Sequence, residues 1–286
     1  MYLMRIGAAG SEKPVVRLDD TSYVDVSDVV TDFNEAFFGS GGLEALRSVV
    51  AERAAAGTVA QFAGERIGAP IARPHQILCI GLNYSDHAAE TGQAVPDEPI
   101  LFTKSPNTLI GPNDDVRIPR GSTKPDWEVE LGIVIGRRCS YLESREEAAA
   151  SIAGFCVVND VSERAFQMDH NGQWCKGKSA ETFNPAGPWL VTPDEIADVQ
   201  ALGMWLDVTG VRRQTGSTAT MIFDPFFIVQ YLSQFLVLEP GDLINTGTPP
   251  GVGMGFKPPV WLQPGDVMEL GIDGLGSQRQ SVLAPR

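Results

Sequence analysis

The sequence has few cysteines and no long apolar run. Its four cysteines form no Cys-x-x-Cys pair, which argues against a zinc-knuckle or redox motif. Three of them (Cys79, Cys139 and Cys156) lie in or beside apolar strand-like runs, where buried, reduced thiols are expected. No stretch approaches the roughly 18–20 apolar residues that span a bilayer, and the N-terminus has no basic stretch followed by an apolar run. We therefore expect a cytoplasmic protein with no membrane partner.

Positive charge is also scarce. The chain has 22 Lys and Arg against 36 Asp and Glu, so its formal net charge is −14. A surface this acidic repels phosphate backbones and anionic headgroups, which argues against nucleic acid and membrane partners. An anionic substrate would need a local positive site to overcome this global field.

The composition is otherwise that of a globular protein, with 43% hydrophobic and 20% charged residues. The 30 glycines and 20 prolines predict many turns and therefore a β-rich chain. Strand-like runs at 4–6 and 15–18 precede a helical pattern at 42–56. Arg73 precedes a proline, which disfavours helical backbone. The sequence thus predicts a small N-terminal α/β domain at 1–72 and a larger domain at 73–286.

The larger domain shows short strand patterns with few helices between them. Strands are predicted at 77–80, 129–135, 155–158, 204–208, 243–245 and 267–270, and only two helices, at 144–152 and 225–235. Pro-Gly pairs at 239–242 and 263–266 favour type II turns, each followed by a strand. Because strands and helices do not alternate regularly, we expect an α+β, mostly β fold and no doubly wound parallel sheet.

The strongest local signal is the segment 126–136, DWEVELGIVIG. Side chains two apart in a strand share a face, so Glu128 and Glu130 should project together and repel unless a proton or cation intervenes. Alone, the pair could also be a solvated strand end. Asp160, which ends a second apolar strand pattern, adds a third carboxylate. Such an all-oxygen set suits a hard cation, Mg²⁺ first, with Mn²⁺ or Ca²⁺ as alternatives.

Two further groups of residues could take part in chemistry. Arg164, Gln167 and Lys178 follow Asp160, and the cationic Arg164 and Lys178 could hold an anionic ligand beside a metal. If residues 87–90 are helical, His87 and Glu90 lie three apart on one face, so the carboxylate could orient the imidazole and raise its basicity enough to deprotonate water. A surface ion pair would show the same spacing.

Residues 172–179 match the phosphate-loop pattern G-x-x-x-x-G-K-[ST]. That motif needs a buried strand before it and a helix after it, whose N-terminus holds the phosphates. No apolar strand pattern precedes it here, and Pro185 follows too soon for a helix. We therefore predict that it binds no nucleotide.

Taken together, these motifs resemble the fumarylacetoacetate hydrolase (FAH) family over roughly residues 74–283. The segments that carry the resemblance are 80–84 leading to His87 and Glu90, 126–136, 159–167, 178–179 and 245–253. The resemblance implies an FAH-type mixed β-roll catalytic domain, often homodimeric. It implies a divalent metal bound by Glu128, Glu130 and Asp160, oxo-acid contacts from Arg164, Gln167, Lys178 and Thr248, and a catalytic role for Lys178 in neutralising charge. It places His87 and Glu90 in the lid that activates water.

Such enzymes cleave a C–C bond in 2-oxo acids that carry a second carbonyl and release pyruvate or a related oxo acid. Segments 174–178 and 255–259 are similar to bacterial members that act on 2,4-dioxo-3-deoxy sugar acids or acylpyruvates. The same scaffold also supports oxaloacetate decarboxylation and isomerisation of the 2-hydroxyhepta-2,4-diene-1,7-dioate type. A non-catalytic oxo-acid or metal-binding protein is an alternative of another class, against which the intact His87 and Glu90 argue.

Overall fold

A ten-stranded mixed sheet runs through the whole molecule. The computed structural model describes residues 1–86 and 95–286. The strands of this sheet lie in the order β4-β3-β2-β1-β14-β11-β10-β17-β5-β6. In chain order they are β1 (Tyr2–Ile6), β2 (Lys13–Arg17), β3 (Ser22–Asp25), β4 (Ala60–Gln61), β5 (Ile77–Gly81), β6 (Ile100–Lys104), β10 (Val129–Ile135), β11 (Ile152–Asn159), β14 (Leu190–Val191) and β17 (Leu243–Asn245).

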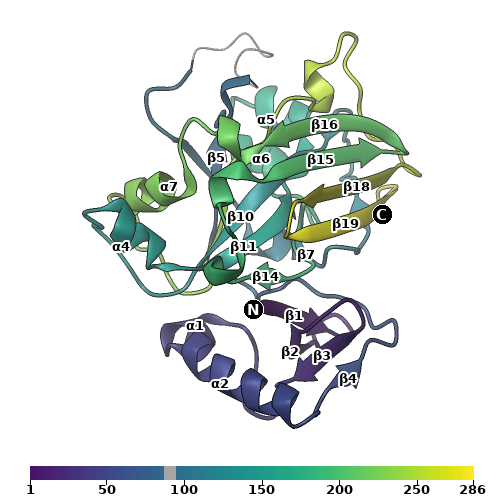
Figure 1. Cartoon of the computed structure of the whole chain (residues 1–286). Coiled ribbons are helices and arrows are strands. Elements are labelled where there is room, and N and C mark those ends of the chain that lie inside the picture. The colour runs from purple at the N-terminus through teal and green to yellow at the C-terminus, as the bar shows by residue number, and fades with distance from the viewer. Residues whose placement is uncertain (87–94) are drawn as a thin grey trace.

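A second sheet packs beside the first and completes the larger unit (Figure 1). Its strand order is β16-β15-β18-β19-β8, formed by Val211–Ser217, Gly203–Val208, Val267–Ile272, Gly276–Leu283 and Val116–Arg117. Two small pairs join β12 (Ser162–Glu163) to β9 (Pro125–Asp126) and β13 (Asn184–Pro185) to β7 (Leu109–Ile110). The predicted α+β, mostly β architecture without a doubly wound sheet is confirmed.

Six helices occur in the described parts of the chain. They are α1 (Glu35–Gly39), α2 (Gly42–Ala55), α4 (Arg145–Ala149), α5 (Arg164–Met168), α6 (Trp174–Lys178) and α7 (Pro225–Leu232). The prediction of only two helices after residue 76 was wrong, because α5 and α6 also form. Each has five residues, too few to show a periodic pattern, and their backbones are stabilised by packing rather than by propensity. None of the described helices is long and apolar enough to cross a membrane.

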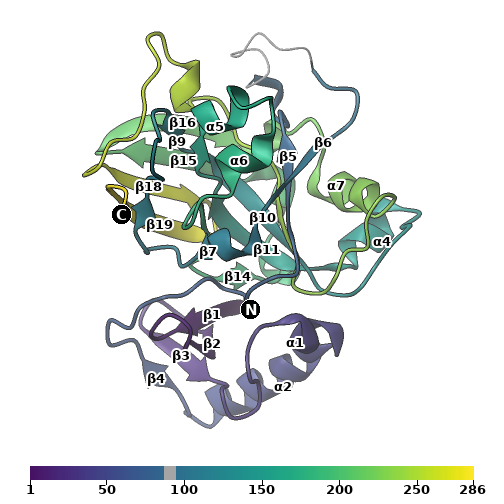
Figure 2. The same ribbon diagram turned by 180° about the vertical axis from the view of Figure 1, so that it is seen from behind.

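The N-terminal segment shares the main sheet. β1 pairs antiparallel with β14, with Tyr2 opposite Val191 and Leu3 opposite Leu190. Figures 1 and 2 show β1–β4, α1 and α2 grouped below β14. One buried apolar cluster joins Leu3 to Leu190 and Val134 of the larger unit. The sheet and core therefore cross residue 72, and the division there into two domains stays a prediction.

The two Pro-Gly turns and the burial of the cysteines agree with the predictions from the sequence. Gly241 and Gly265 have φ of +86° and +99°, as the third position of a type II turn requires. β17 and β18 leave these two turns as predicted. Cys79, Cys139 and Cys156 are buried and unpaired, whereas Cys175 on α6 is exposed.

Candidate metal and oxo-acid site

Two neighbouring strands bring the three predicted carboxylates together. β10 pairs antiparallel with β11, with Val129 opposite Asn159, so Glu128 just before β10 lies beside Asp160 just after β11. The Asp160 amide donates to the Glu128 carbonyl at 2.9 Å. One carboxylate oxygen from each of Glu128, Glu130 and Asp160 lies within 4.8 Å of the others, and all three side chains are buried. This is a donor set that could hold a divalent metal.

Two cations join these carboxylates from the short helices. Arg164, the first residue of α5, donates to Glu128 at 2.5 Å and to Asp126 at 2.8 Å. Lys178, the last residue of α6, donates to Glu128 at 2.6 Å and to Asp160 at 2.8 Å. Burial by itself would raise the pKa of Glu128, but Lys178 and Arg164 hold it below its ordinary value. Burial by itself would lower the pKa of Lys178, but Asp160 and Glu128 raise it. Both groups are therefore charged at neutral pH.

Sequence reasoning missed two members of this network, Lys104 and Asp126. The ammonium of Lys104 is fully buried and donates to Asp160 and to the carbonyls of Val161 and Phe183. Asp126 accepts from Arg164 and from the backbone amides of Trp127 and Gly253. A polar residue that closes an apolar strand was the signal that identified Asp160. Lys104 is likewise the polar last residue of β6, so the same signal could have identified it.

Glu130 differs from its neighbours because it has no ion pair among the described residues. Its carboxylate accepts from the Gly247 amide at 2.8 Å. Burial, together with the charges of Asp160 and Glu128, raises its pKa well above the ordinary value. Four carboxylates (Asp126, Glu128, Glu130 and Asp160) thus meet three cations (Lys104, Arg164 and Lys178), leaving one formal negative charge. A bound divalent cation would turn this excess positive and favour an anionic ligand.

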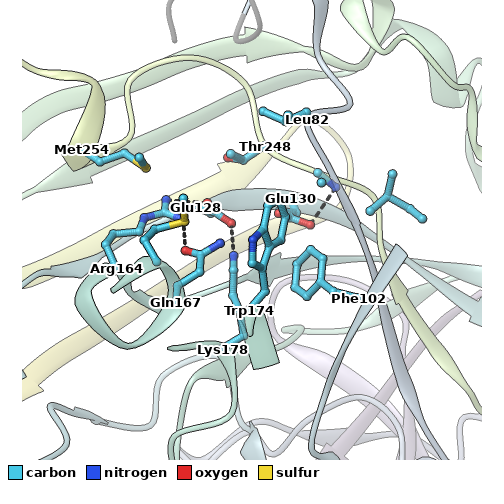
Figure 3. A pocket seen from close by; sticks show the side chains of 14 residues that line it. Leu82, Phe102, Glu128, Glu130, Arg164, Gln167, Trp174, Lys178, Thr248 and Met254 are labelled. Atoms are coloured by element: carbon cyan, nitrogen blue, oxygen red, sulfur yellow. Dashed lines mark hydrogen bonds and ion pairs between the residues drawn. The ribbon is translucent and has the colours of Figure 1, made fainter. Parts of the chain in front are cut away.

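A pocket opens onto this cluster (Figure 3). Glu128, Glu130, Arg164, Gln167, Lys178 and Thr248 all line it. The Gln167 side-chain oxygen accepts from Arg164 at 2.9 Å. The Thr248 hydroxyl donates to the Val129 carbonyl and accepts from Gln214, both at 2.8 Å. The structure therefore gathers all the predicted site residues that it describes, while His87 and Glu90 lie outside the described residues.

The phosphate-loop pattern does not have the structure of a phosphate loop. Helix α5 precedes it in place of a buried strand, and α6 lies within the motif rather than after it. Lys178 points to Glu128 (Figure 3). It also donates to Asp160 at 2.8 Å. Its ammonium thus pairs with carboxylates, and the expectation that the segment binds no nucleotide stays a prediction.

Comparison with known proteins gives consistent matches. Residues 76–283 match the family model described as "Fumarylacetoacetate (FAA) hydrolase C-terminal". A relative from Burkholderia ambifaria is 50% identical over 288 residues, which cover all of both chains. Its name assigns it provisionally to the hydrolases. A probable 2-hydroxyhepta-2,4-diene-1,7-dioate isomerase from Mycobacterium abscessus has a similar structure, with a TM-score of 0.84 and 30% identity over all of both chains. Maleylpyruvate hydrolase from Sphingobium sp. SYK-6, solved with manganese(II) and pyruvate, gives a TM-score of 0.82 and 26% identity over all of both chains.

Proposed function

The chain belongs to the fumarylacetoacetate hydrolase family, and on that basis we propose that it is a divalent-metal-dependent hydrolase of 2,4-dioxo acids. The reaction adds water to the C4 carbonyl of the substrate and breaks the C3–C4 bond. The bonding electron pair stays on C3, which takes a proton, so the products are pyruvate and a second carboxylic acid. The observation that supports this most strongly is the buried three-carboxylate cluster flanked by Lys178 and Arg164.

Glu128, Glu130 and Asp160 would hold the cation, with Mg²⁺ first and Mn²⁺ or Ca²⁺ as alternatives. When bound, a divalent cation supplies Lewis acidity that stabilises negative charge on the oxo acid. The hard oxygen donors fit such an ion, and the unbalanced Glu130 gives it a charge to neutralise. Manganese in the related maleylpyruvate hydrolase agrees with a divalent ion in this family.

The chain's own residues supply the remaining functions. Lys178 and Arg164 sit at the pocket wall with fixed positive charge, so they would bind the substrate carboxylate and neutralise charge as the C–C bond breaks. Gln167 and Thr248 would orient the oxo acid from the same pocket. We assign the activation of water to His87, with Glu90 orienting its imidazole.

Pyruvate release from a panel of acylpyruvates, 2,4-dioxo-3-deoxy acids and oxaloacetate tests this function. Hydrolysis predicts equimolar pyruvate and second acid, with oxygen from isotope-labelled water in the second acid. Metal-dependent oxalate binding without turnover of any panel member would instead support a non-catalytic oxo-acid-binding protein. The absence of both oxalate binding and turnover would reject the function.

Decarboxylation or isomerisation is the second candidate, favoured by the structural similarity to an isomerase of this family. Neither reaction needs an attacking water. A His87→Ala variant should therefore lose about 10²–10⁴-fold in hydrolytic kcat but retain oxaloacetate decarboxylation. General-base catalysis contributes more than about threefold. If acylpyruvate hydrolysis by His87→Ala stays within about threefold of wild type, His87 is therefore not the base, and the second candidate takes precedence.

A further inference from the structure

The same pocket has an apolar wall, formed by Leu82, Phe102, Met168, Trp174 and Met254. Figure 3 shows the labelled members of this wall close to the polar residues that face the carboxylate cluster. Trp174 meets Phe102 edge to face, with ring centroids 5.3 Å apart. The indole also packs directly on Gly81, where an added Cβ would lie 2.6 Å from the ring. The aromatic part of the wall is therefore closely packed.

Leu82 is held in the wall by a backbone conformation that leucine rarely adopts, with φ of +53°. The next residue explains how this conformation is maintained. The buried Asn83 amide donates to the carbonyls of Phe223 and Thr246 at 3.0 and 2.7 Å, and its oxygen accepts from the Phe223 amide at 2.8 Å. Surrounding contacts thus hold Leu82 in a rare backbone conformation at the edge of a site. Such strain is common at functional sites and indicates that the Leu82 side chain has a function there.

The apolar wall is also tied to the metal carboxylates. Gly247, whose amide donates to Glu130, packs so closely on Asn83 that an added Cβ would lie 2.8 Å from the asparagine Cβ. The Met254 amide donates to Asp126 at 3.2 Å, and Asp126 pairs with Arg164. Leu82 and Met254 are thus positioned by the residues that position the reacting end of the pocket.

The polar side chains of the described pocket have little capacity left for a polar tail. Arg164 and Lys178 pair with the metal-site carboxylates and would bind the C1 carboxylate, Gln167 accepts from Arg164, and the Thr248 hydroxyl both donates and accepts within the protein, so these groups serve the metal end of the pocket. A hydroxyl or carboxylate buried against the apolar wall would lose its hydration without gaining a partner. An alkyl or aryl group would instead gain from leaving water.

We infer that this chain selects 2,4-dioxo acids whose acyl group, the part beyond C4, is apolar. This inference rests on the proposed hydrolysis and specifies its substrate class. Of the two substrate types that the sequence resemblance suggested, it favours acylpyruvates with an apolar end over the hydroxylated 2,4-dioxo-3-deoxy sugar acids.

A matched series of three substrates tests the inference on the metal-loaded enzyme: 2,4-dioxoheptanoate, its 7-hydroxy derivative and 2,4-dioxoheptanedioate. They differ only at C7, which is a methyl, a hydroxymethyl or a carboxylate group. We expect the methyl-ended substrate to have the highest kcat/KM, by about tenfold or more over the carboxylate. The difference should appear mainly in KM, because the wall binds the part of the substrate that does not react.

Two variants assign this preference to the wall. Leu82→Gly suits a positive φ and removes the side chain, so it should fold and reduce the preference several-fold. Tyr141→Gly is the matched control, because Tyr141 also has a positive φ of +54° but is 73% exposed and does not line the pocket. It should keep the wild-type preference.

The outcomes separate the two proposals. Higher kcat/KM for the hydroxyl or carboxylate end, or an unchanged preference in Leu82→Gly, would overturn the apolar selection while hydrolysis stands. If no substrate of the series is cleaved and oxalate does not bind in the presence of Mn²⁺, the proposed function fails, and this inference fails with it.

Discussion

Glu130 is the residue on which the charge balance of the site depends. It is buried, and no ion pair balances it among the described residues. A Glu130→Gln variant should keep an acceptor for the Gly247 amide yet lose a ligand charge. We expect Mn²⁺ affinity, measured by calorimetry, to fall by at least the roughly 10–100-fold that loss of an outer-shell partner costs. The surface variant Glu181→Gln should bind Mn²⁺ as tightly as wild type does. If Glu130→Gln binds Mn²⁺ as tightly as Glu181→Gln, the assigned ligand set is wrong.

The raised pKa of Glu130 also predicts how stability depends on pH in the metal-free protein. A carboxyl group whose folded pKa lies above its unfolded value stabilises the fold fully below the unfolded value. That contribution is lost as the pH rises through the folded pKa. The free energy of unfolding of wild type relative to Glu130→Gln should therefore fall as the pH rises above the unfolded value of about 4.3. Saturating Mn²⁺ should reverse the trend in wild type; a pH-independent difference would show that the pKa is not raised.

Lys104 shows a second consequence of burying charge. Its ammonium is fully buried against Asp160, so removing it leaves that carboxylate with one fewer cation. Breaking a buried pair in this way typically costs about 3–5 kcal/mol of folding free energy. Chemical denaturation of metal-free Lys104→Met should show a loss of this size, while the exposed Lys176→Met should be near neutral. A loss below about 1 kcal/mol, as for a surface pair, would indicate that Lys104 does not neutralise Asp160.

The sequence predicted the three clustered carboxylates but not the ion pairs that connect them to cations. Glu128, Glu130 and Asp160 could be predicted because strand periodicity and apolar runs ending in acids are local patterns. Lys104 reaches Asp160 across 56 positions of the chain, and no local pattern contains that contact. The ion pairs of Arg164 and Lys178 were equally non-local.

At the scale of elements, the close packing of α5 and α6 positions Arg164 and Lys178. Gly177 faces α5 so closely that an added Cβ would lie 2.4 Å from the Glu163 carbonyl oxygen and 2.6 Å from the Gln167 amide nitrogen. These are backbone atoms and cannot rotate away. Gly177→Ala should therefore separate the helices, cost about 1–3 kcal/mol of stability and displace the neighbouring Lys178.

Thermal unfolding measures the loss of stability in Gly177→Ala, and oxalate binding in the presence of Mn²⁺ measures the displacement of Lys178. Lys176→Ala, on the exposed face of the same helix, is the control and should change neither. If Gly177→Ala binds oxalate as tightly as wild type, the spacing of α5 and α6 is not what positions Lys178.

The elements also show where prediction from sequence ends. Strands β10 and β17 were predicted with their observed bounds, because each is a mostly apolar segment bounded by polar or turn residues. The first turn of α5 is instead capped by Glu163, whose carboxylate accepts from the Ala165 amide at 3.0 Å and also binds Ser122 and the Lys124 amide. Those contacts exist only in the folded chain, which explains why the helix was missed.

At the scale of the whole molecule, the sheet and the core join the N-terminal segment to the larger unit. Leu3 is fully buried in a cluster that includes Leu190 and Val134. Leu3→Ala should cost about 2–5 kcal/mol and lower the midpoint of a single unfolding transition. Val29→Ala, at a side chain in the same segment that is 53% exposed, is the control and should have little effect. Two separate calorimetric transitions would show that residues 1–72 unfold independently.

We propose that the buried carboxylate cluster makes this chain a metal-dependent C–C hydrolase. The most direct test of this proposal is pyruvate release from 2,4-dioxoheptanoate by one preparation before chelation, after exhaustive chelation and after metal is restored, with metal content measured at each step. If the cluster holds the catalytic metal, activity should fall to background in the metal-free protein and return with Mg²⁺ or Mn²⁺. Undiminished pyruvate release from protein shown to contain no metal would contradict it.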